Sequence, residues 1–256
     1  MMQPGAGIET YLSRVRRAHQ EIERERPNLV QAARLLADSL EGEPDRVIHV
    51  FGTGHSHLLV EEAFWRAGGL VPVNPILDPN LTAFGGSRAS ALERLEGYAE
   101  VLLSGEEVRE GEAMVIFSNS GINAVPVEMA LGARERGLVI VAITSLAHSR
   151  SVESRHPSGR KLFELADATI DTHVPPGDAA VELSGVLGDG ADGLRAGPLS
   201  TVVGAALLNA LAVEVACLRA ASGAEPPVFV SQNLPDVEER NETLLSRYRP
   251  RSRFYR

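Results

Sequence analysis

The spacing of apolar positions changes along the chain, and the change separates a helical N-terminal region from the remainder. Residues 8–40 carry many Arg and Glu side chains with apolar positions at roughly helical spacing. These positions are Ile8, Leu12, Val15 and Ile22. Pro27 should break the run, with Asn28 as the cap of a second helix. The pattern therefore predicts two amphipathic helices before the first strand.

From residue 46 onward, short apolar runs alternate with helical patterns. The predicted strands are 46–52, 70–75, 113–118, 138–145 and 166–172, and the predicted helices are 56–69, 92–105, 124–137 and 199–222. Strands that are apolar at nearly every position are typical of a mostly parallel sheet with helices on both faces. We therefore predict an α/β domain over 46–222. Helices within 1–45 should pack on it or on a partner subunit, and 223–256 forms a C-terminal extension.

Composition and charge narrow the function classes. The formal net charge of −9 argues against a nucleic-acid or membrane-surface binder, whose affinity comes from clustered cations. A single cysteine, Cys217, provides no disulfide framework and no cysteine-based metal site, which fits the cytoplasm. The most apolar stretch, 198–218, is interrupted by Asn209 and Glu214, so we interpret it as a buried helix of a soluble core.

The loops that follow the predicted strands are the places to look for chemistry, because ligands of open α/β sheets bind beyond the carboxyl ends of the strands. "FGTGHS" (51–56) begins like a dinucleotide fingerprint, with Gly52 and Gly54. However, His57 stands where that fingerprint needs a third glycine, and Asn74 stands where it needs an acidic residue. A nicotinamide site is therefore not predicted. Two glycines that let the backbone approach a ligand remain, with Ser56 at a helix start.

A second polar loop, "SNSGIN" (118–123), follows the third predicted strand. Its side chains offer hydroxyls and amides, Gly121 lets the turn expose N–H groups, and the next helix directs its positive end at the loop. The residues that offer these groups are Ser118, Asn119, Ser120 and Asn123. Phosphate binding is one interpretation. The other is an ordinary N-capped helix, because serine and asparagine are preferred caps.

Taken together, these motifs resemble the SIS (sugar isomerase) domain family. The resemblance is carried by "GTGHS", "SNSG", "TS" (Thr144 and Ser145) and "GPLSTVVGAALLNALAVEV" (197–215), and covers about 46–220. "EEAFWRAGGLVPVNPIL" and "SRHPSGRKLFELAD" resemble a branch known only as sugar isomerase domain proteins, related to phosphoheptose and arabinose-5-phosphate isomerases. The family pattern has a hydroxyl residue where this chain has Asn123.

The resemblance implies a five-stranded parallel flavodoxin-like sheet, a homodimer or homotetramer, and binding of a phosphorylated sugar or amino sugar. The phosphate would contact the loops 52–56 and 118–123, with Thr144 and Ser145 nearby. The implied activity in carbohydrate metabolism is aldose–ketose isomerisation through an enediol. An amino-sugar-phosphate lyase or etherase and a non-catalytic sugar-phosphate sensor remain alternatives.

Isomerisation requires a base and a group that opens the sugar ring, but no metal or cofactor if side chains supply both. Glu62, two helical turns after His55, is one candidate base, and a helix-surface charge is the competing interpretation. Glu182 is the rival, because related isomerases carry a carboxylate beyond the fifth strand. His55 is the candidate for ring opening. The arginine-rich segment 247–256 is interpreted as a disordered end, or as an arm reaching a partner subunit.

Overall fold

The computed structural model describes residues 4–183 and 193–255. Five parallel strands form one sheet in the order β2-β1-β3-β4-β5. They are β1 (Ile48–Gly52), β2 (Val73–Ile76), β3 (Ala113–Phe117), β4 (Val139–Thr144) and β5 (Ala168–Asp171). The five predicted strands are confirmed, with ends that shift by up to three residues.

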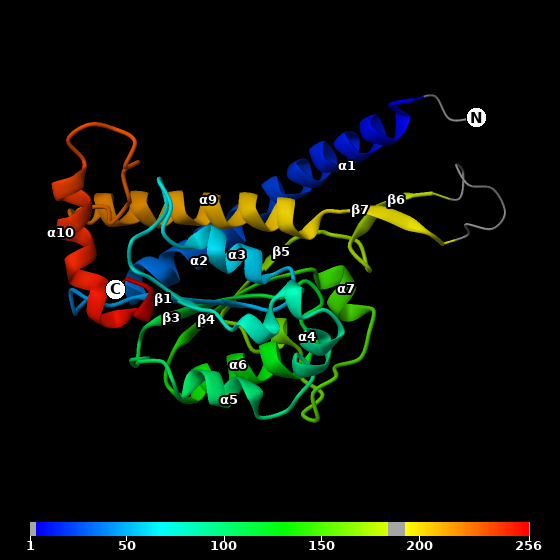
Figure 1. The fold of residues 1–256 in the computed structure, drawn as a ribbon, viewed down its shortest axis with the longest axis horizontal. Helices are drawn as coiled ribbons and strands as arrows, with labels where there is room; N and C mark the ends of the chain where they lie inside the picture. The colour runs from blue at the N-terminus through cyan, green and yellow to red at the C-terminus, as the bar shows by residue number, and fades with distance from the viewer. Residues whose placement is uncertain (1–3, 184–192, 256) are drawn as a thin grey trace.

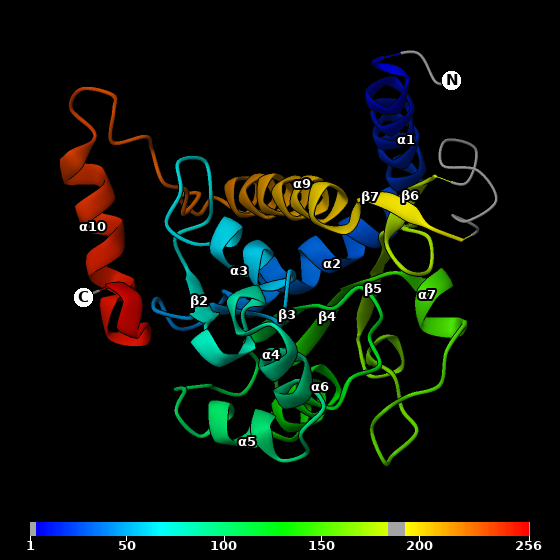
Figure 2. The same cartoon turned by 45° about the vertical axis from the view of Figure 1, so that its right-hand side comes forward.

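Helices cover both faces of this sheet, as the views in Figures 1 and 2 show. One face carries α2 (Arg26–Ser39), α3 (His57–Ala63) and α9 (Ser200–Ala221), and the other carries α4 (Ser87–Leu92), α5 (Tyr98–Leu103) and α6 (Ala124–Glu135). Successive residues of a strand point to opposite faces of the sheet. In β3, Val115 belongs to the core beneath α2, α3 and α9, and Ile116 belongs to the core beneath α5 and α6. The flavodoxin-like α/β fold is confirmed.

The N-terminal region contains two helices, as predicted, but they divide at a different place. Helix α1 (Ala6–Ile22) ends in a 3₁₀ turn at Glu23–Glu25, and α2 already begins at Arg26. Pro27 lies in the first turn of α2, where its missing N–H leaves no helical bond unmade. The predicted Asn28 cap is wrong, because its amide donates instead to the Glu25 carboxylate at 2.8 Å.

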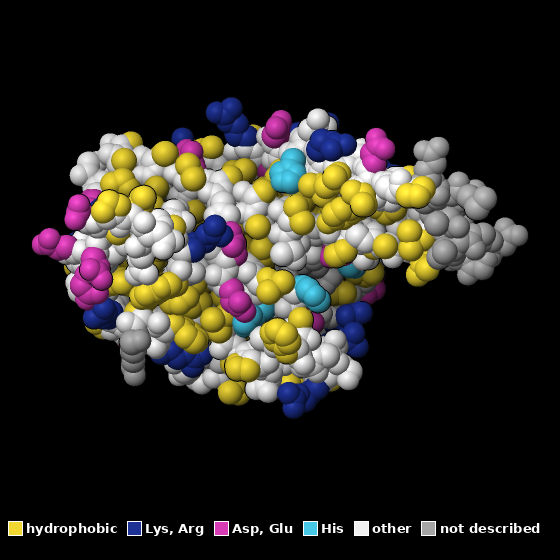
Figure 3. Space-filling model, turned by 45° about the horizontal axis from the view of Figure 1, so that its top comes forward, with side chains coloured by type: hydrophobic (Ala, Val, Ile, Leu, Met, Phe, Trp, Pro, Cys, Tyr) yellow, Lys and Arg dark blue, Asp and Glu magenta, His cyan; other side chains and the backbone are white. Residues whose placement is uncertain are grey.

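Helix α9 is the one described helix that is long and apolar enough to cross a membrane, by length and composition. One side of it packs on the core through Val203, Leu207, Leu208 and Leu211, but only 33% of its most apolar stretch is buried, so the prediction of a buried helix holds for that side alone. Its outward side chains include Val202 and Val213, which are 38% and 60% exposed. Figure 3 looks onto this side of the molecule, where hydrophobic side chains are spread between charged ones.

Two elements lie beyond the sheet. Strands β6 (Ala179–Glu182) and β7 (Arg195–Pro198) pair antiparallel in a separate two-stranded sheet beside α1. A short helix, α7 (Leu146–Arg150), follows β4. The predicted helix 92–105 is wrong as a single element, because Gly97 adopts a left-handed φ of 81° and separates α4 from α5.

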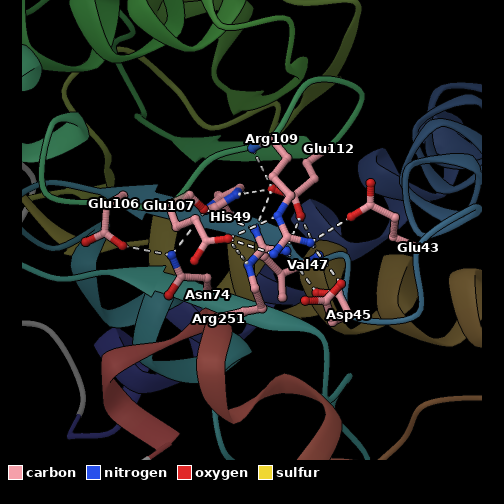
Figure 4. A network of polar contacts seen from close by, with 10 residues as sticks. All are labelled: Glu43, Asp45, Val47, His49, Asn74, Glu106, Glu107, Arg109, Glu112 and Arg251. Atoms are coloured by element: carbon pink, nitrogen blue, oxygen red, sulfur yellow. Dashed lines mark hydrogen bonds and ion pairs between the residues drawn. The ribbon is translucent and has the colours of Figure 1, made fainter.

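The C-terminal segment is ordered against the body, so its interpretation as a disordered end is wrong. Helix α10 (Glu238–Tyr248) is followed by two 3₁₀ turns, and these elements pack over Val47 and Val71 through Leu244, Leu245, Tyr248 and Tyr255. Figure 4 shows that Arg251, near the end of the chain, is part of a network of polar contacts with Glu112, His49 and Glu107. The network lies at the amino ends of the strands, opposite the loops considered for ligand binding.

Glu112 is the centre of this network and has no exposed surface. Its carboxylate accepts hydrogen bonds from Val47 N at 3.0 Å and His49 Nε2 at 2.9 Å, and pairs with both terminal nitrogens of Arg251 at 2.9 and 3.1 Å. Burial alone would raise the pKa of Glu112, but the hydrogen bonds from His49 and Arg251 outweigh it and lower the pKa to about 2. The C-terminal segment is therefore held by a buried, ionised carboxylate.

Candidate functional site

The two polar loops meet at the point where the strand order reverses. β1 and β3 are neighbours, and the chain leaves them toward opposite edges of the sheet, which creates the crevice where α/β proteins bind ligands. Glycine is required in both loops. A Cβ on Gly52 would lie 2.6 Å from the Ser56 carbonyl oxygen, and Gly121 has a φ of 63°. Both loops can therefore fold tightly against this crevice.

Between the loops lies a small pocket with a cavity volume of about 10 Å³. Its polar lining comes from four parts of the fold: the start of α3, the loop after β3, the end of β5 and the start of α9. The polar residues are Ser56, Ser118, Asn119, Thr172, Ser200 and Thr201. No described lining residue carries an ionisable side chain. Five hydroxyls and one amide converge here, but Ser200 Oγ and the backbone N of Leu199 and Ser200 at the start of α9 already donate to the Asp178 carboxylate.

Hydrogen bonds within SNSGIN fix the shape of the loop. Ser118 Oγ accepts from Gly121 N at 3.1 Å, and the Asn119 carbonyl accepts from Ser145 N at 3.0 Å. Asn123 does not cap α6, because its Oδ1 accepts from Arg155 Nη1 at 2.7 Å. The interpretation of the loop as an asparagine-capped helix start is therefore wrong.

The amides of α6 contribute less to this pocket than the sequence suggested. Val125 N donates to the carbonyl oxygen of Glu93 at 3.0 Å, and Pro126 has no N–H. Two of the first donors of the helix are thus unable to bind a ligand. The polar lining of the pocket therefore comes from hydroxyl side chains rather than from the N–H groups of α6.

Thr144 and Ser145 lie outside the pocket lining and connect neighbouring segments. Thr144 Oγ1 donates to the Asn119 carbonyl at 3.3 Å, while Ser145 Oγ donates to the Val174 carbonyl at 2.6 Å and accepts from His148 N at 3.1 Å. Both side chains are fully buried. Their hydroxyls hold the loops after β3, β4 and β5 together, which sets the relative positions of Ser118, Asn119 and Thr172.

Glu62 lies farther along α3 than Ser56, where α3 packs against α9. Helices α3 and α9 run side by side in the same direction: Ser56 and Thr201 line the pocket, a Cβ on Gly204 would meet Leu59 at 2.5 Å, and Asn209 Nδ2 donates to Glu62 Oε1 at 2.9 Å. Glu62 also forms an ion pair with Arg66. Glu62 is six positions after Ser56, so it lies about 9 Å farther along the axis of α3, at about 1.5 Å per residue.

The other predicted catalytic residues lie elsewhere. His55 is exposed in the loop after β1, next to Gly54, whose φ of 57° lets this loop turn. Ser120 is half-buried in SNSGIN but is not part of the pocket lining. Glu182 is on β6 of the separate hairpin, with an exposed carboxylate 3.9 Å from Arg195. Glu62 is therefore the predicted base whose helix also lines the pocket.

The start of α9 is the part of the site that sequence reasoning from single residues missed. Asp178, 22 residues before Ser200, accepts from the backbone N of Leu199 at 3.0 Å and of Ser200 at 2.7 Å. This contact anchors the first turn of α9 against the end of β5, where Thr172 lies. The only signal in the sequence was the resemblance of 197–215 to the C-terminal helix of sugar-phosphate isomerases.

Comparison with known proteins assigns the family. A model of the SIS domain matches residues 10–145, more than half of the chain, and the chain belongs to the SIS-domain family. Among its relatives, UPF0309 protein GK1441 of Geobacillus kaustophilus is 40% identical over 228 residues, covering 89% of this chain and 88% of that protein. UPF0309 protein Teth39_1980 of Thermoanaerobacter pseudethanolicus is 40% identical over 227 residues, covering 88% and 90%.

Solved structures share the fold at low identity. Phosphoheptose isomerase GmhA of Neisseria gonorrhoeae superposes with a TM-score of 0.53 at 16% identity, covering 85% of this chain and all of that one. A phosphoheptose isomerase of Francisella tularensis gives 0.51 at 15% identity, covering 84% and 98%. The Vibrio vulnificus NanR protein, complexed with ManNAc-6P, gives 0.50 at 15% identity, covering 86% and 65%.

Proposed function

We propose that the protein binds a phosphorylated sugar, with the phosphate in the pocket between the loops after β1 and β3. The observation that carries this proposal is the convergence of five hydroxyls and an amide beside the start of α9, at the topological switch point of the sheet. Several neutral hydrogen-bond donors that converge on one place can hold a phosphate without a lysine. The relatives support this ligand class, since they include phosphoheptose isomerases and a protein complexed with ManNAc-6P.

We further propose that the bound sugar undergoes aldose–ketose isomerisation, with Glu62 as the base. An open chain of six or seven carbons is roughly 8 Å long, given carbon–carbon bonds of about 1.5 Å. With its phosphate near Ser56, such a chain extended along α3 reaches the Glu62 carboxylate with C1 and C2. Glu62 takes the proton from C2, the C1 oxygen gains a proton to give the enediol, and the proton returns to C1 while the C2 hydroxyl loses its own.

The test separates binding from turnover. A panel of aldose and ketose phosphates is incubated with the protein in D₂O, and deuterium at C1 or C2 is followed by NMR. Glu62→Gln should lower kcat by about 10²–10⁴, the usual contribution of a general base. Glu61→Gln, on the exposed side of the same helix, is the matched control and should retain activity. Turnover that survives Glu62→Gln would exclude Glu62 as the base, and loss of a leaving group would indicate a lyase or etherase instead.

Binding is measured on its own by thermal shift, because a ligand that binds the folded state raises the melting temperature. Ser118→Ala should weaken phosphosugar binding about tenfold, the effect of one lost hydrogen bond to an anion. Failure of inorganic phosphate and every phosphosugar to stabilise the protein would reject the proposed ligand class, whatever the result of the turnover assay.

A sugar-phosphate sensor is the second candidate. It is favoured by one observation, that the described lining of the pocket contains no ionisable side chain. A sensor needs to hold its ligand without a base in contact with it. Phosphosugars that raise the melting temperature while none is converted would favour the sensor over the isomerase.

A further inference from the structure

A second pocket lies beyond the end of α3 and shares no lining residue with the first. Its volume is about 210 Å³, and it lies between the turn after α3 and residues 229–233, in the connection from α9 to α10. The lining combines two aromatic rings with polar side chains: Trp65, Arg66, Ala67, Phe229, Val230, Ser231, Gln232 and Asn233. Nothing in the proposed isomerisation uses this pocket.

Trp65, the single tryptophan of the chain, adopts an unusual backbone conformation at this place. Its φ is 50°, in the left-handed region that bulky side chains rarely adopt. Gly68, three residues later, also has a positive φ, 80°, but glycine adopts this conformation without steric strain. Strained residues of this kind cluster at ligand sites, because the surrounding structure holds them there for a purpose other than stability. The strained backbone therefore makes the Trp65 side chain a candidate for contact with a ligand.

The indole is held at the surface rather than buried. Its ring centre lies 5.6 Å from those of Phe229 and Tyr255, in tilted arrangements, yet 44% of the residue stays exposed. Tyr255 belongs to the C-terminal segment anchored by the Glu112–Arg251 ion pair. The contacts with Phe229 and Tyr255 thus hold the indole in place on one side and leave its exposed part able to contact a ligand.

The rim of the pocket supplies neutral hydrogen-bonding groups. Gln232 and Asn233 are exposed, and in the part of the chain that the structure describes neither side-chain amide has a hydrogen-bond partner. The one charge in the lining, Arg66, is paired with Glu62. The pocket therefore offers an aromatic surface and unused amide donors and acceptors, without a free charge for an ionic ligand.

We propose that this pocket binds a neutral monosaccharide ring, distinct from the phosphorylated sugar of the first pocket. The C–H face of a pyranose packs against an indole through apolar contact, while its hydroxyls exchange hydrogen bonds with amides. A cavity of about 210 Å³ is smaller than the roughly 300–1,000 Å³ of pockets for drug-sized ligands, which limits the ligand to about one ring.

The single tryptophan makes the test direct, because its emission reports on this pocket alone. The protein is titrated with glucose, mannose, galactose and N-acetylglucosamine, with adenosine as a neutral stacking ligand that is not a sugar. A saturable change in emission with at least one sugar and none with adenosine is expected. Asn233→Ala and Gln232→Ala should each raise the Kd about tenfold through a lost hydrogen bond, and both positions are exposed, so folding is preserved.

Ser118→Ala separates this proposal from the phosphosugar site, since it should leave the neutral-sugar titration unchanged. Three results would overturn the second site: no saturable response to any sugar, a response to adenosine alone, or a response abolished by Ser118→Ala but unaffected at Asn233. A change in emission with protein concentration alone would show instead that a second copy of the chain covers Trp65.

Discussion

The buried ion pair between Glu112 and Arg251 gives the sharpest stability prediction. Arg251→Met removes the guanidinium but keeps an apolar side chain of similar length. The Glu112 carboxylate, with no exposed surface, then loses its main cationic partner. Breaking a buried pair in this way costs about 3–5 kcal/mol, because an uncompensated charge remains in the interior.

The pKa of Glu112 reflects how strongly all its surroundings together, His49 and Val47 as well as Arg251, favour the ionised carboxylate. Folding lowers this pKa from 4.5 to about 2, so the ionised form stabilises the folded state. At 1.36 kcal/mol per pKa unit the difference corresponds to about 3 kcal/mol. Since the folded pKa is the lower one, this contribution is complete above about pH 5 and is lost as the pH falls toward 2.

Thermal and urea denaturation at neutral pH measure the effect. For a chain of this length a loss of about 3–5 kcal/mol lowers Tm by roughly 10 °C. The matched control is Arg253→Met, two residues along the same segment, where the side chain is half exposed and its contact with Glu106 is 3.6 Å long. The Glu106 side chain is buried but keeps its hydrogen bond from Asn74 Nδ2 at 2.9 Å, and the arginine is half exposed, so this change should cost at most about 1 kcal/mol.

A double-mutant cycle tests the mechanism. The Glu112→Gln and Arg251→Met changes share one contact, so their combined effect should be smaller than the sum of the separate effects. Glu112→Gln alone should also remove most of the loss of stability between pH 5 and pH 2. Equal effects of Arg251→Met and Arg253→Met, or additive effects of the two buried changes, would refute the reasoning.

Three further changes test the geometry of the ligand site. Gly121→Ala should lower the free energy of unfolding by about 1–3 kcal/mol, because φ is 63° and the new methyl group would lie 3.1 Å from the Thr144 hydroxyl. Gly159→Ala is the control, because Gly159 has a similar φ of 68° but no atom within 4 Å of the added methyl group. In urea denaturation the Gly159 variant should lose less stability than the Gly121 variant. Asp178→Ala should cost about 1–2 kcal/mol by freeing the first turn of α9, and unchanged urea midpoints would show that this cap is not needed. Gly204→Ala should cost roughly 1–3 kcal/mol, since its methyl group would lie 2.5 Å from Leu59, and it should also reduce the thermal shift produced by phosphosugars; a variant with normal stability would mean that α3 and α9 pack less closely.

The sequence by itself determined the sheet and the two glycine loops. Strands such as 113–117 are apolar at every position because helices cover both faces, and this signal is local and needs no knowledge of the partner strands. Gly52 and Gly121 are likewise local, since each allows a turn that a side chain would block. The family resemblance rested on the two glycine loops together with longer segments such as 197–215, and the SIS family assignment confirmed it.

Only the tertiary structure decided which side chains meet. Asp178 anchors α9 from 22 residues away, Asn209 reaches Glu62 across 147, and Arg251 enters the core to meet Glu112 across 139. The sequence around a polar residue does not indicate whether its side chain faces solvent or a buried partner. For this reason the charge pattern predicted that the C-terminal arginines are solvated, whereas Arg251 is buried. The contacts that complete the site and fix the chain end depend on packing between distant segments, which local patterns do not encode.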